Sequence, residues 1–475
     1  MSNPKQVKSG AEKRFFIDML TKDIELLPAI ADLVDNSVDG VRHLASDSDL
    51  EGYWVAIDVD GAGFEIRDNA GGISTDIARN YAFHFGRPAE FQGVPGSVGQ
   101  FGIGMKRAIF KLGTAFEVES NWASQGGETQ THFLVKESVS KWAARGDDWS
   151  FSFAELDENI KQQNADPTGT RIKVSPLHRS VAEDLADDSV VQQLKNELAI
   201  RHQQSILNGL KVTVNGGRLK AHRPILQSSD EFAPINYSFV VDAEVEGYSG
   251  KVHVKLTAGT VAPPSAQKDL DDGQASNFTN TGEAGWYVFC NDRLLLAADR
   301  SSFTGWGSTA AAYHPQYRNF RGYVYMESED ARFLPWNTTK TAVDRDSAVF
   351  REVATKMKVA LVDVQALINR AKIERERVKS LDEAGIEDYT SPKLSSAMDV
   401  TRNLPLESIP TSRVLVAPEP AALPPIPRPG PTTQRIQYQV EIDRYQKLST
   451  LFGTNNGSAL GRATFDYVWK AEVSE

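Results

Sequence analysis

The fold prediction begins with the segment Asp32-Leu33-Val34-Asp35-Asn36-Ser37-Val38-Asp39, in which a carboxylate and an amide stand four residues apart. Side chains at positions i and i+4 of a helix lie one above the other on the same face. Pro28 suits the first turn of this helix, because its missing N–H costs nothing there. Apolar residues at helical spacing predict one buried face: Ile30, Leu33, Val34, Val38 and Val41. Asp32, Asn36 and Asp39 are expected to border that face, where the first two can hold a magnesium ion and a water.

A second segment, Asp68-Asn69-Ala70-Gly71-Gly72, places a carboxylate just before a turn that only small residues can make. Residues 53–59 and 64–67 alternate apolar and polar side chains, which predicts two paired strands joined by a turn at residues 60–63. Asp68 then falls at the end of the second strand. Taken alone, this segment is also typical of an ordinary turn after a strand.

A glycine-rich third segment, Gly99-Gln100-Phe101-Gly102-Ile103-Gly104-Met105-Lys106, runs into a helix predicted over residues 105–112. Three glycines are costly in chain entropy unless the backbone must approach another group closely. Such a loop offers backbone N–H groups to phosphate oxygens, the helix N-terminus adds a favourable partial charge, and Lys106 is placed to neutralise phosphate. The spacing matches neither a P-loop nor the dinucleotide pattern. The alternative is a flexible surface loop.

Together the three segments predict a pocket for ATP, and their order and spacing resemble those of Bergerat-fold, or GHKL, ATPases. This group includes gyrase B, the heat-shock chaperone of the same fold, histidine kinases and MutL. Within it, the chain is similar to microrchidia-like, MutL-like and heat-shock-chaperone-type ATPases. The resemblance implies an α+β sandwich, with a mixed and mostly antiparallel sheet and helices on one face, followed by a transducer-like α/β domain.

The first segment carries catalysis in this family, whose members use a Glu to polarise the attacking water and an Asn to hold magnesium. The resemblance assigns these roles to Asp32, as general base, and to Asn36, with Asp39 in the place of the family's further Asp. Asp is one methylene shorter than Glu, so its carboxylate must come closer to the water, and slow hydrolysis is expected. The alternative is that Asp32 only caps or solvates the helix.

The resemblance also gives the second segment a role in binding adenine. The family's Asp accepts the exocyclic amine of adenine, which implies this role for Asp68, with Gly72 retained and Ala70 in place of one family glycine. A fourth match is Gly169-Thr170-Arg171-Ile172-Lys173-Val174, similar to the Gly-Thr strand that closes the adenine pocket. Thr170 would bond the Asp68 carboxylate directly or through a water. Gly99, Gly102 and Gly104 would form a lid over the phosphates.

In the MutL and gyrase branch, a lysine from a transducer domain reaches the γ-phosphate. Lys340 precedes a long helix predicted from Ser347 to about Lys379, where such a residue is expected, and a surface lysine is the alternative. A fixed cation there stabilises charge that develops during phosphoryl transfer. The helix is highly charged after Arg370, which predicts a solvated extension or, alternatively, a coiled arm.

The predicted organisation has four parts. Residues 1–178 are expected to form the ATP-binding domain, residues 179–379 the transducer-like domain ending in a long helix, residues 380–433 a proline-rich linker and residues 434–475 a small C-terminal element suited to docking. Within the second part, one helix is expected over residues 181–200 and one strand over residues 285–295.

Composition limits the function further. The net charge of −11 and the lack of any run of five basic residues argue against coating nucleic acid through bulk charge. A single cysteine, Cys290, and an N-terminus without a signal-peptide core predict a cytoplasmic protein. The sequence contains no run of eighteen apolar residues, so no membrane span is predicted. Eight scattered histidines argue against a transition-metal enzyme.

The leading hypothesis is a magnesium-dependent ATPase with slow turnover, whose lid closes over ATP. The resemblance implies an ATP-dependent homodimer formed through the N-terminal domain, acting on a DNA or protein client. One alternative is a non-hydrolysing ATP sensor. Another is a phosphotransferase of the histidine-kinase type, which is disfavoured because no His precedes Asp32.

Overall fold

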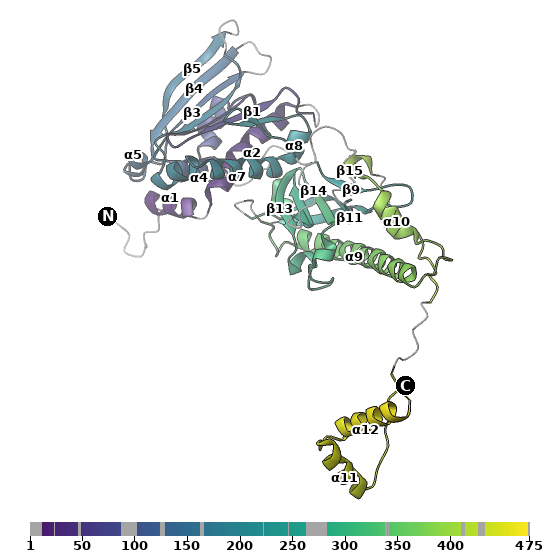
Figure 1. The fold of residues 1–475 in the computed structure, drawn as a ribbon. Helices are drawn as coiled ribbons and strands as arrows, with labels where there is room; N and C mark the ends of the chain where they lie inside the picture. The colour runs from purple at the N-terminus through teal and green to yellow at the C-terminus, as the bar shows by residue number, and fades with distance from the viewer. Residues whose placement is uncertain are drawn as a thin grey trace. The chain divides into compact units, whose positions relative to one another are not determined.

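A computed structural model describes residues 12–22, 24–45, 49–86, 102–123, 129–161, 166–221, 223–245, 247–262, 283–337, 340, 342–409, 414–425 and 433–473. The chain divides into two compact units, residues 1–423 and residues 424–475. The described part of the first unit contains two large sheets, each packed on helices, and a two-stranded sheet. We call the parts built on the two large sheets the first and second domains (Figure 1).

The first domain is built on an eight-stranded sheet with the strand order β5-β4-β3-β6-β2-β1-β7-β8. Its strands are β1 (Trp54–Val59), β2 (Phe64–Asp68), β3 (Ala115–Ala123), β4 (Thr129–Ser138), β5 (Phe153–Lys161), β6 (Gly169–Val174), β7 (Lys211–Val214) and β8 (Gly217–Arg218). All neighbouring strands are antiparallel except β1 and β7. The mixed, mostly antiparallel sheet confirms the predicted α+β class.

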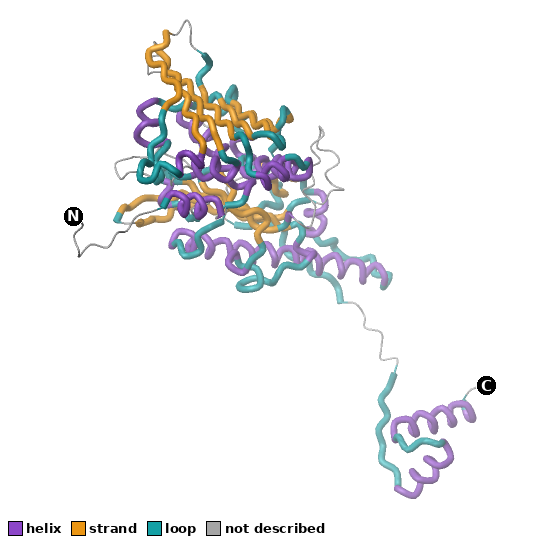
Figure 2. The backbone as a smooth tube through the Cα atoms, turned by 90° about the vertical axis from the view of Figure 1, so that its left-hand side faces the viewer, coloured by secondary structure: helices purple, strands orange, loops and turns teal. Residues whose placement is uncertain are grey.

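Helices of the first domain lie along one face of this sheet (Figures 1 and 2). They are α1 (Lys13–Lys22), α2 (Leu26–Leu44), α3 (Thr75–Ile77), α4 (Gly104–Leu112), α5 (Val139–Ala143), α6 (Arg179–Leu185), α7 (Asp188–Arg201) and α8 (Gln203–Leu207). The helix α3 continues into a single π-helical turn, Ala78–Ala82. Ile30, Val34 and Val38 of α2 are buried against the sheet, as their spacing predicts.

The predicted boundary after residue 178 is wrong, because the first domain continues to β8. The strand β7 pairs in parallel with β1, with Val55 opposite Val212 and Ile57 opposite Val214. The single helix expected over residues 181–200 is two helices, since α7 begins anew after Asp187, whose side chain accepts from the Ser189 amide.

The second domain has a five-stranded sheet in the order β10-β11-β14-β12-β13, covered by the long helix α9. Its strands are β10 (Ile235–Val245), β11 (Tyr248–Thr260), β12 (Gly285–Cys290), β13 (Arg293–Asp299) and β14 (Phe320–Glu327). The strand expected over residues 285–295 is a hairpin, because Asn291 and Asp292 both adopt positive φ angles, of 44° and 63°. Because apolar residues flank this turn on both sides, the sequence pattern predicts one continuous strand.

The helix α9 spans Ala348–Glu383, and most side chains of its charged half are exposed, as predicted, while one face with Ala371, Glu374 and Leu381 is buried. A further helix, α10 (Lys393–Val400), packs against it through Leu394 and Met398, which join a buried cluster with Leu367 and Ala371. Part of the interval predicted to be a linker, residues 380–433, is therefore folded onto the second domain. A short strand, β15 (Asn403–Pro405), also pairs there with β9 (Ile225–Gln227).

The described part of the C-terminal unit contains two helices, α11 (Ile442–Phe452) and α12 (Gly457–Glu472). The rings of Phe452 and Tyr467 meet edge to face with their centroids 6.0 Å apart. Across the described part of the chain, no helix combines the length and the apolar character needed to cross a bilayer.

Candidate active site

A pocket of about 350 Å³ opens between α2, the end of β2, the start of α4 and β6. Its apolar lining includes Leu33, Ile66, Ile73, Met105 and Ile172. Its polar lining includes the predicted residues Asp32, Asn36, Asp39, Asp68, Lys106, Thr170 and Lys340. Ala70, Gly72, Gly102, Ile103 and Gly104 complete the set of predicted residues found in the lining. An apolar wall with a few fixed polar groups suits a planar base attached to a charged tail.

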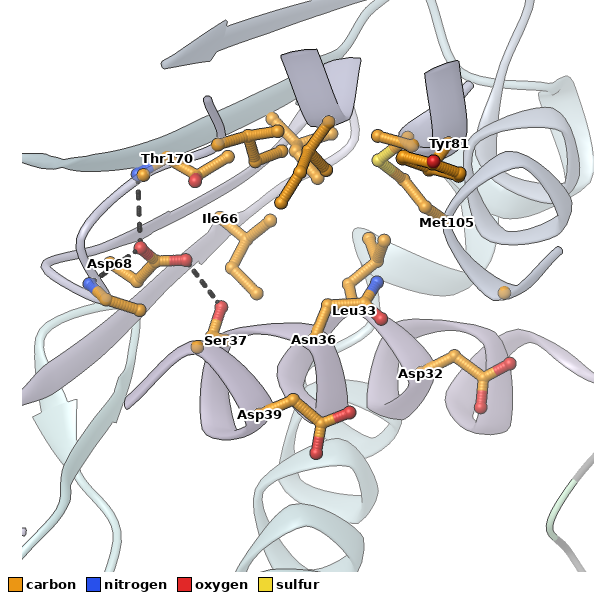
Figure 3. A pocket seen from close by; sticks show the side chains of 18 of the residues that line it. Asp32, Leu33, Asn36, Ser37, Asp39, Ile66, Asp68, Tyr81, Met105 and Thr170 are labelled. Carbon is orange, nitrogen blue, oxygen red and sulfur yellow. Dashed lines mark hydrogen bonds between the residues drawn. The ribbon is translucent and has the colours of Figure 1, made fainter. Parts of the chain in front are cut away.

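Asp68 is held at one end of the pocket by three hydrogen bonds (Figure 3). Its Oδ2 accepts from the Ser37 hydroxyl at 2.6 Å, and its Oδ1 accepts from the amides of Ala70 at 3.0 Å and Thr170 at 3.1 Å. Burial raises the pKa of the Asp68 carboxyl, although the three hydrogen bonds oppose that rise. The direct bond expected from Thr170 is made by its backbone amide. Asp68 is therefore an oriented acceptor.

The turn after Asp68 depends on glycine at position 72. Gly72 has a φ of +76°, and a Cβ there would lie 2.2 Å from the carbonyl oxygen of Asn121. Ala70 is buried and fits without a positive φ, which explains why one family glycine is dispensable here. This turn brings the chain over the adenine end of the predicted site.

Leu33, Asn36 and Ser37 of α2 point across the pocket toward Ile66 and Asp68 (Figure 3). The Asn36 side chain is exposed, and no hydrogen bond to it is present among the described residues. Magnesium prefers oxygen ligands and commonly takes one or two from protein, with waters and substrate phosphates supplying the rest. The Asn36 amide oxygen fits that role. No group of three or more His, Cys, Asp or Glu side chains in the described ranges forms a separate metal site.

The glycine-rich segment is described from Gly102 onward, so Gly99, Gln100 and Phe101 lie outside the described residues. Gly102 has a φ of +65°, and α4 begins at Gly104 with its N-terminus toward Asp32. A Cβ at Gly104 would lie 3.4 Å from Asp32 Oδ2. The amides of this first helical turn have no partner within the helix and can bind an anion.

The sequence predicts that the Lys106 ammonium neutralises phosphate, but in this structure the ammonium is hydrogen-bonded to backbone carbonyl groups. Its Nζ donates to the carbonyl oxygen of Ala82 at 2.8 Å and to that of Gly102, and the side chain is buried. Lys106 therefore stabilises the conformation of the loop in this structure. Its neighbour on α4, Arg107, is the residue that reaches Asp32.

A buried group of charges surrounds Asp32 and Asp35, which are both almost fully enclosed. Arg107 Nη2 lies 2.5 Å from Asp32 Oδ2, and Arg293 Nη2 lies 3.4 Å from Asp32 Oδ1. Arg293 also pairs with Asp35 through Nη1, and Lys340 Nζ lies 3.6 Å from Asp35 Oδ2. Asp32 is thus an ion-pair partner and not a solvated cap of α2. We call Asp32, Asp35, Arg107, Arg293 and Lys340 the charge cluster.

Lys340 is buried in the charge cluster, not exposed on the surface. Burial lowers the pKa of its ammonium to about 8, while the charge of Asp32 acts in the opposite direction. Lys340 also lines the pocket. The second domain therefore contributes a cation to a pocket otherwise built by the first domain.

Four contributors to this site were not predicted as site residues: Asp35, Ser37, Arg107 and Arg293. Asp35 and Ser37 flank Asn36, so the helical spacing that placed Asn36 could have placed them too. Arg107 is buried on α4 next to Lys106, and helical spacing alone does not tell which of the two faces Asp32. Arg293 lies 261 positions after Asp32, and nothing in its local sequence indicates a contact across domains.

The family model described as histidine kinase-, DNA gyrase B-, and HSP90-like ATPase matches residues 24–165. This range contains α2, Asp68 and the glycine-rich segment, and it ends before Thr170. No curated protein matches the chain. The first domain is accordingly a member of the Bergerat-fold, or GHKL, ATPase family, a class of ATP-binding domain.

Asp68→Asn is expected to weaken ATP binding at least tenfold, or about 1.4 kcal/mol, because an amide nitrogen would replace one carboxylate acceptor at the adenine end. Calorimetric titration with ATP measures this change. Asp58→Asn is the matched control, since Asp58 pairs with Arg67 on the exposed surface of β1 and should leave affinity unchanged. Equal affinity of the Asp68 variant and the wild type would contradict the assignment of adenine to this end.

The stability of the first unit is expected to fall as the pH drops below 6.5, because His202 is buried next to the charge cluster. Burial, followed by the charge of Arg201, lowers the pKa of His202 to about 3. Its folded pKa lies below its unfolded pKa of about 6.5, so the unfolded chain binds the proton first and acid favours unfolding.

Between pH 7 and pH 5 the wild type should lose about 2 kcal/mol more unfolding free energy than His202→Gln. Urea unfolding at both pH values measures the difference. Identical pH dependence in the two proteins would show that His202 titrates normally in the folded state.

Proposed function

We propose that this chain is a magnesium-dependent ATPase with slow turnover, which uses ATP to change the arrangement of its two domains. The observation that carries this proposal is the meeting of Asp68, Asn36, Asp32 and Lys340 in one pocket. These four side chains supply an adenine acceptor, a metal ligand, a carboxylate and a cation from a second domain.

Adenine would lie against Ile66, Ile73 and Ile172, with its amine donating to Asp68. An acidic acceptor at this place favours adenine over guanine, which presents a carbonyl oxygen there. Asn36 would hold magnesium, together with phosphate oxygens and waters. Bound magnesium would neutralise phosphate charge and help to align the γ-phosphate for attack.

The phosphates would extend toward the N-terminus of α4 and toward Lys340, where backbone amides and an ammonium offer positive charge. Lys340 would contact the γ-phosphate and stabilise the charge that develops during transfer. Asp32 would act as general base. Its short side chain and its present pairing with Arg107 both support slow hydrolysis.

ATP would order the glycine-rich segment and bring the second domain onto the γ-phosphate, and hydrolysis would release both. We also propose that the N-terminal domain forms an ATP-dependent homodimer and that the domain motion acts on a DNA or protein client. The support for these two steps is the membership of the first domain in the GHKL family.

A second candidate function is a non-hydrolysing ATP sensor. The pairing of Asp32 with two guanidinium groups favours it, because each carboxylate oxygen already has a cationic partner. In this case ATP would still move the second domain through Lys340. Dissociation of ATP, rather than its hydrolysis, would return the second domain to its starting position.

Substitution of Asp32 separates the two candidates. Asp32→Ala should lower phosphate release on the order of a hundredfold while ATP remains bound, because a general base contributes about 10² or more. Asp32→Glu should release phosphate at least as fast as the wild type, and Asp58→Ala should not change the rate. Wild-type release no faster than that of Asp32→Ala, with ATP bound in both, would reject the ATPase and support the sensor.

A further inference from the structure

The β12–β13 hairpin of the second domain is fixed to the catalytic helix α2. Arg42 of α2 donates from Nη1 to the carbonyl oxygen of Asn291 at 2.9 Å and from Nη2 to Asp292 Oδ2 at 2.8 Å. Asn291 and Asp292 form the turn of the hairpin. The turn therefore cannot move away from α2 without breaking a bidentate contact of a partly buried arginine.

Arg293, the first residue of β13, follows this turn and carries its guanidinium into the first domain. It is one of the largest fully buried side chains among the described residues, and it pairs with both Asp32 and Asp35. Burial lowers its pKa, opposed by the charge of Asp32. A buried arginine that bridges two carboxylates of another domain links the positions of the two domains.

Asp32 has a cationic partner on each oxygen. Arg107 is at Oδ2, and Arg293 is at Oδ1. A water that is to lose a proton to Asp32 must compete with one of these guanidinium groups. Arg107 belongs to the same domain as Asp32, whereas Arg293 is part of the second domain and would move with it. Movement of the hairpin is therefore the simplest way to open one oxygen of Asp32.

The charge cluster has three cations and two carboxylates within ion-pair distance. The carboxylate of Asp39 also acts on Lys340, so the cluster has no excess of positive charge, but its buried cations can exchange a carboxylate partner for another anion. A γ-phosphate next to Lys340 would supply that anion and would weaken the hold of the carboxylates on Arg293. The arrangement thus provides a physical reason for ATP to loosen the contact of Arg293 with Asp32.

We propose that Arg293 is a positioning residue that restrains the Asp32 carboxylate until the second domain moves, so that it sets the rate of Asp32-dependent hydrolysis. This inference rests on the proposed ATPase function. It assigns a restraining role to the β12–β13 hairpin, in contrast to the activating role of Lys340. Arg293 acts through Asp32 and is not itself a catalytic residue.

The test is phosphate release by the full chain at saturating magnesium and ATP. Arg293→Gln should raise turnover three- to tenfold, and Arg293→Lys should restore a rate close to that of the wild type. In an Asp32→Ala background, Arg293→Gln should have no effect, because the residue acts through that carboxylate. Arg67→Gln, which removes an exposed ion pair on β2, is the control and should leave turnover unchanged.

A second variant guards against misfolding, since removal of one partner from a buried ion pair is strongly destabilising. Asp292→Asn removes only the partly exposed partner of Arg42 and should raise turnover about twofold by loosening the hairpin. Hydrogen exchange at the β12–β13 turn, measured without nucleotide, should increase in the same variant.

Three results would overturn the inference. The first is unchanged or reduced turnover in folded Arg293→Gln, or in Asp292→Asn when the first variant does not fold. The second is an equal increase in the Asp32→Ala background. The third is wild-type turnover no greater than that of Asp32→Ala, which would overturn the proposed function and the inference together. The first two leave the proposed function standing, so the two failures are distinguishable.

Discussion

The pairing of Asp32 and Asp35 with cations from two domains is the interaction on which the site depends. Charges buried in a protein interior are tolerated only when they are paired, and removal of one partner leaves the other at high cost. Here the carboxylates come from α2, while the cations come from α4, β13 and the loop before α9. The charged environment of Asp32 and Asp35 in the first domain therefore depends on the position of the second domain.

The two ends of the pocket differ in which domain supplies their side chains. At the adenine end, Asp68 is fixed by Ser37 and by the amides of Ala70 and Thr170, all from the first domain. At the phosphate end, Lys340 and Arg293 belong to the second domain, and the glycine-rich segment leads into α4. A base site built by one domain next to a phosphate site shared by two domains is the arrangement on which the proposed coupling of nucleotide to domain position depends.

Local sequence predicted the parts of the site that local structure builds. Helical spacing placed Asn36 and Asp32 together, a strand followed by a small-residue turn placed Asp68, and the family resemblance implied that Thr170 lies beside it. Contacts between distant segments could not be predicted in this way. Arg293 reaches Asp32 only because Asn291 and Asp292 turn the chain back, and Arg107 rather than Lys106 faces Asp32 because of how α4 packs.

The limits of the domains likewise depend on contacts between distant segments, which local sequence does not predict. Periodicity placed the paired strands β1 and β2, but not the pairing of β7 with β1 that extends the first domain past residue 178. Low apolar periodicity after Leu381 predicted a linker, yet Leu394 and Met398 suffice to pack α10 on α9. A short amphipathic helix is stabilised mainly by the element that it packs on, and the local sequence does not identify that element.

The central claim is that the ATP site is completed by a cation of the second domain. A crystal structure with magnesium and a non-hydrolysable ATP analogue tests it most directly. The account predicts the adenine amine within hydrogen-bond distance of Asp68, magnesium on Asn36, and Lys340 at the γ-phosphate instead of at Asp35. A nucleotide bound at Asp68 with Lys340 still paired to Asp35 and distant from the γ-phosphate would contradict it.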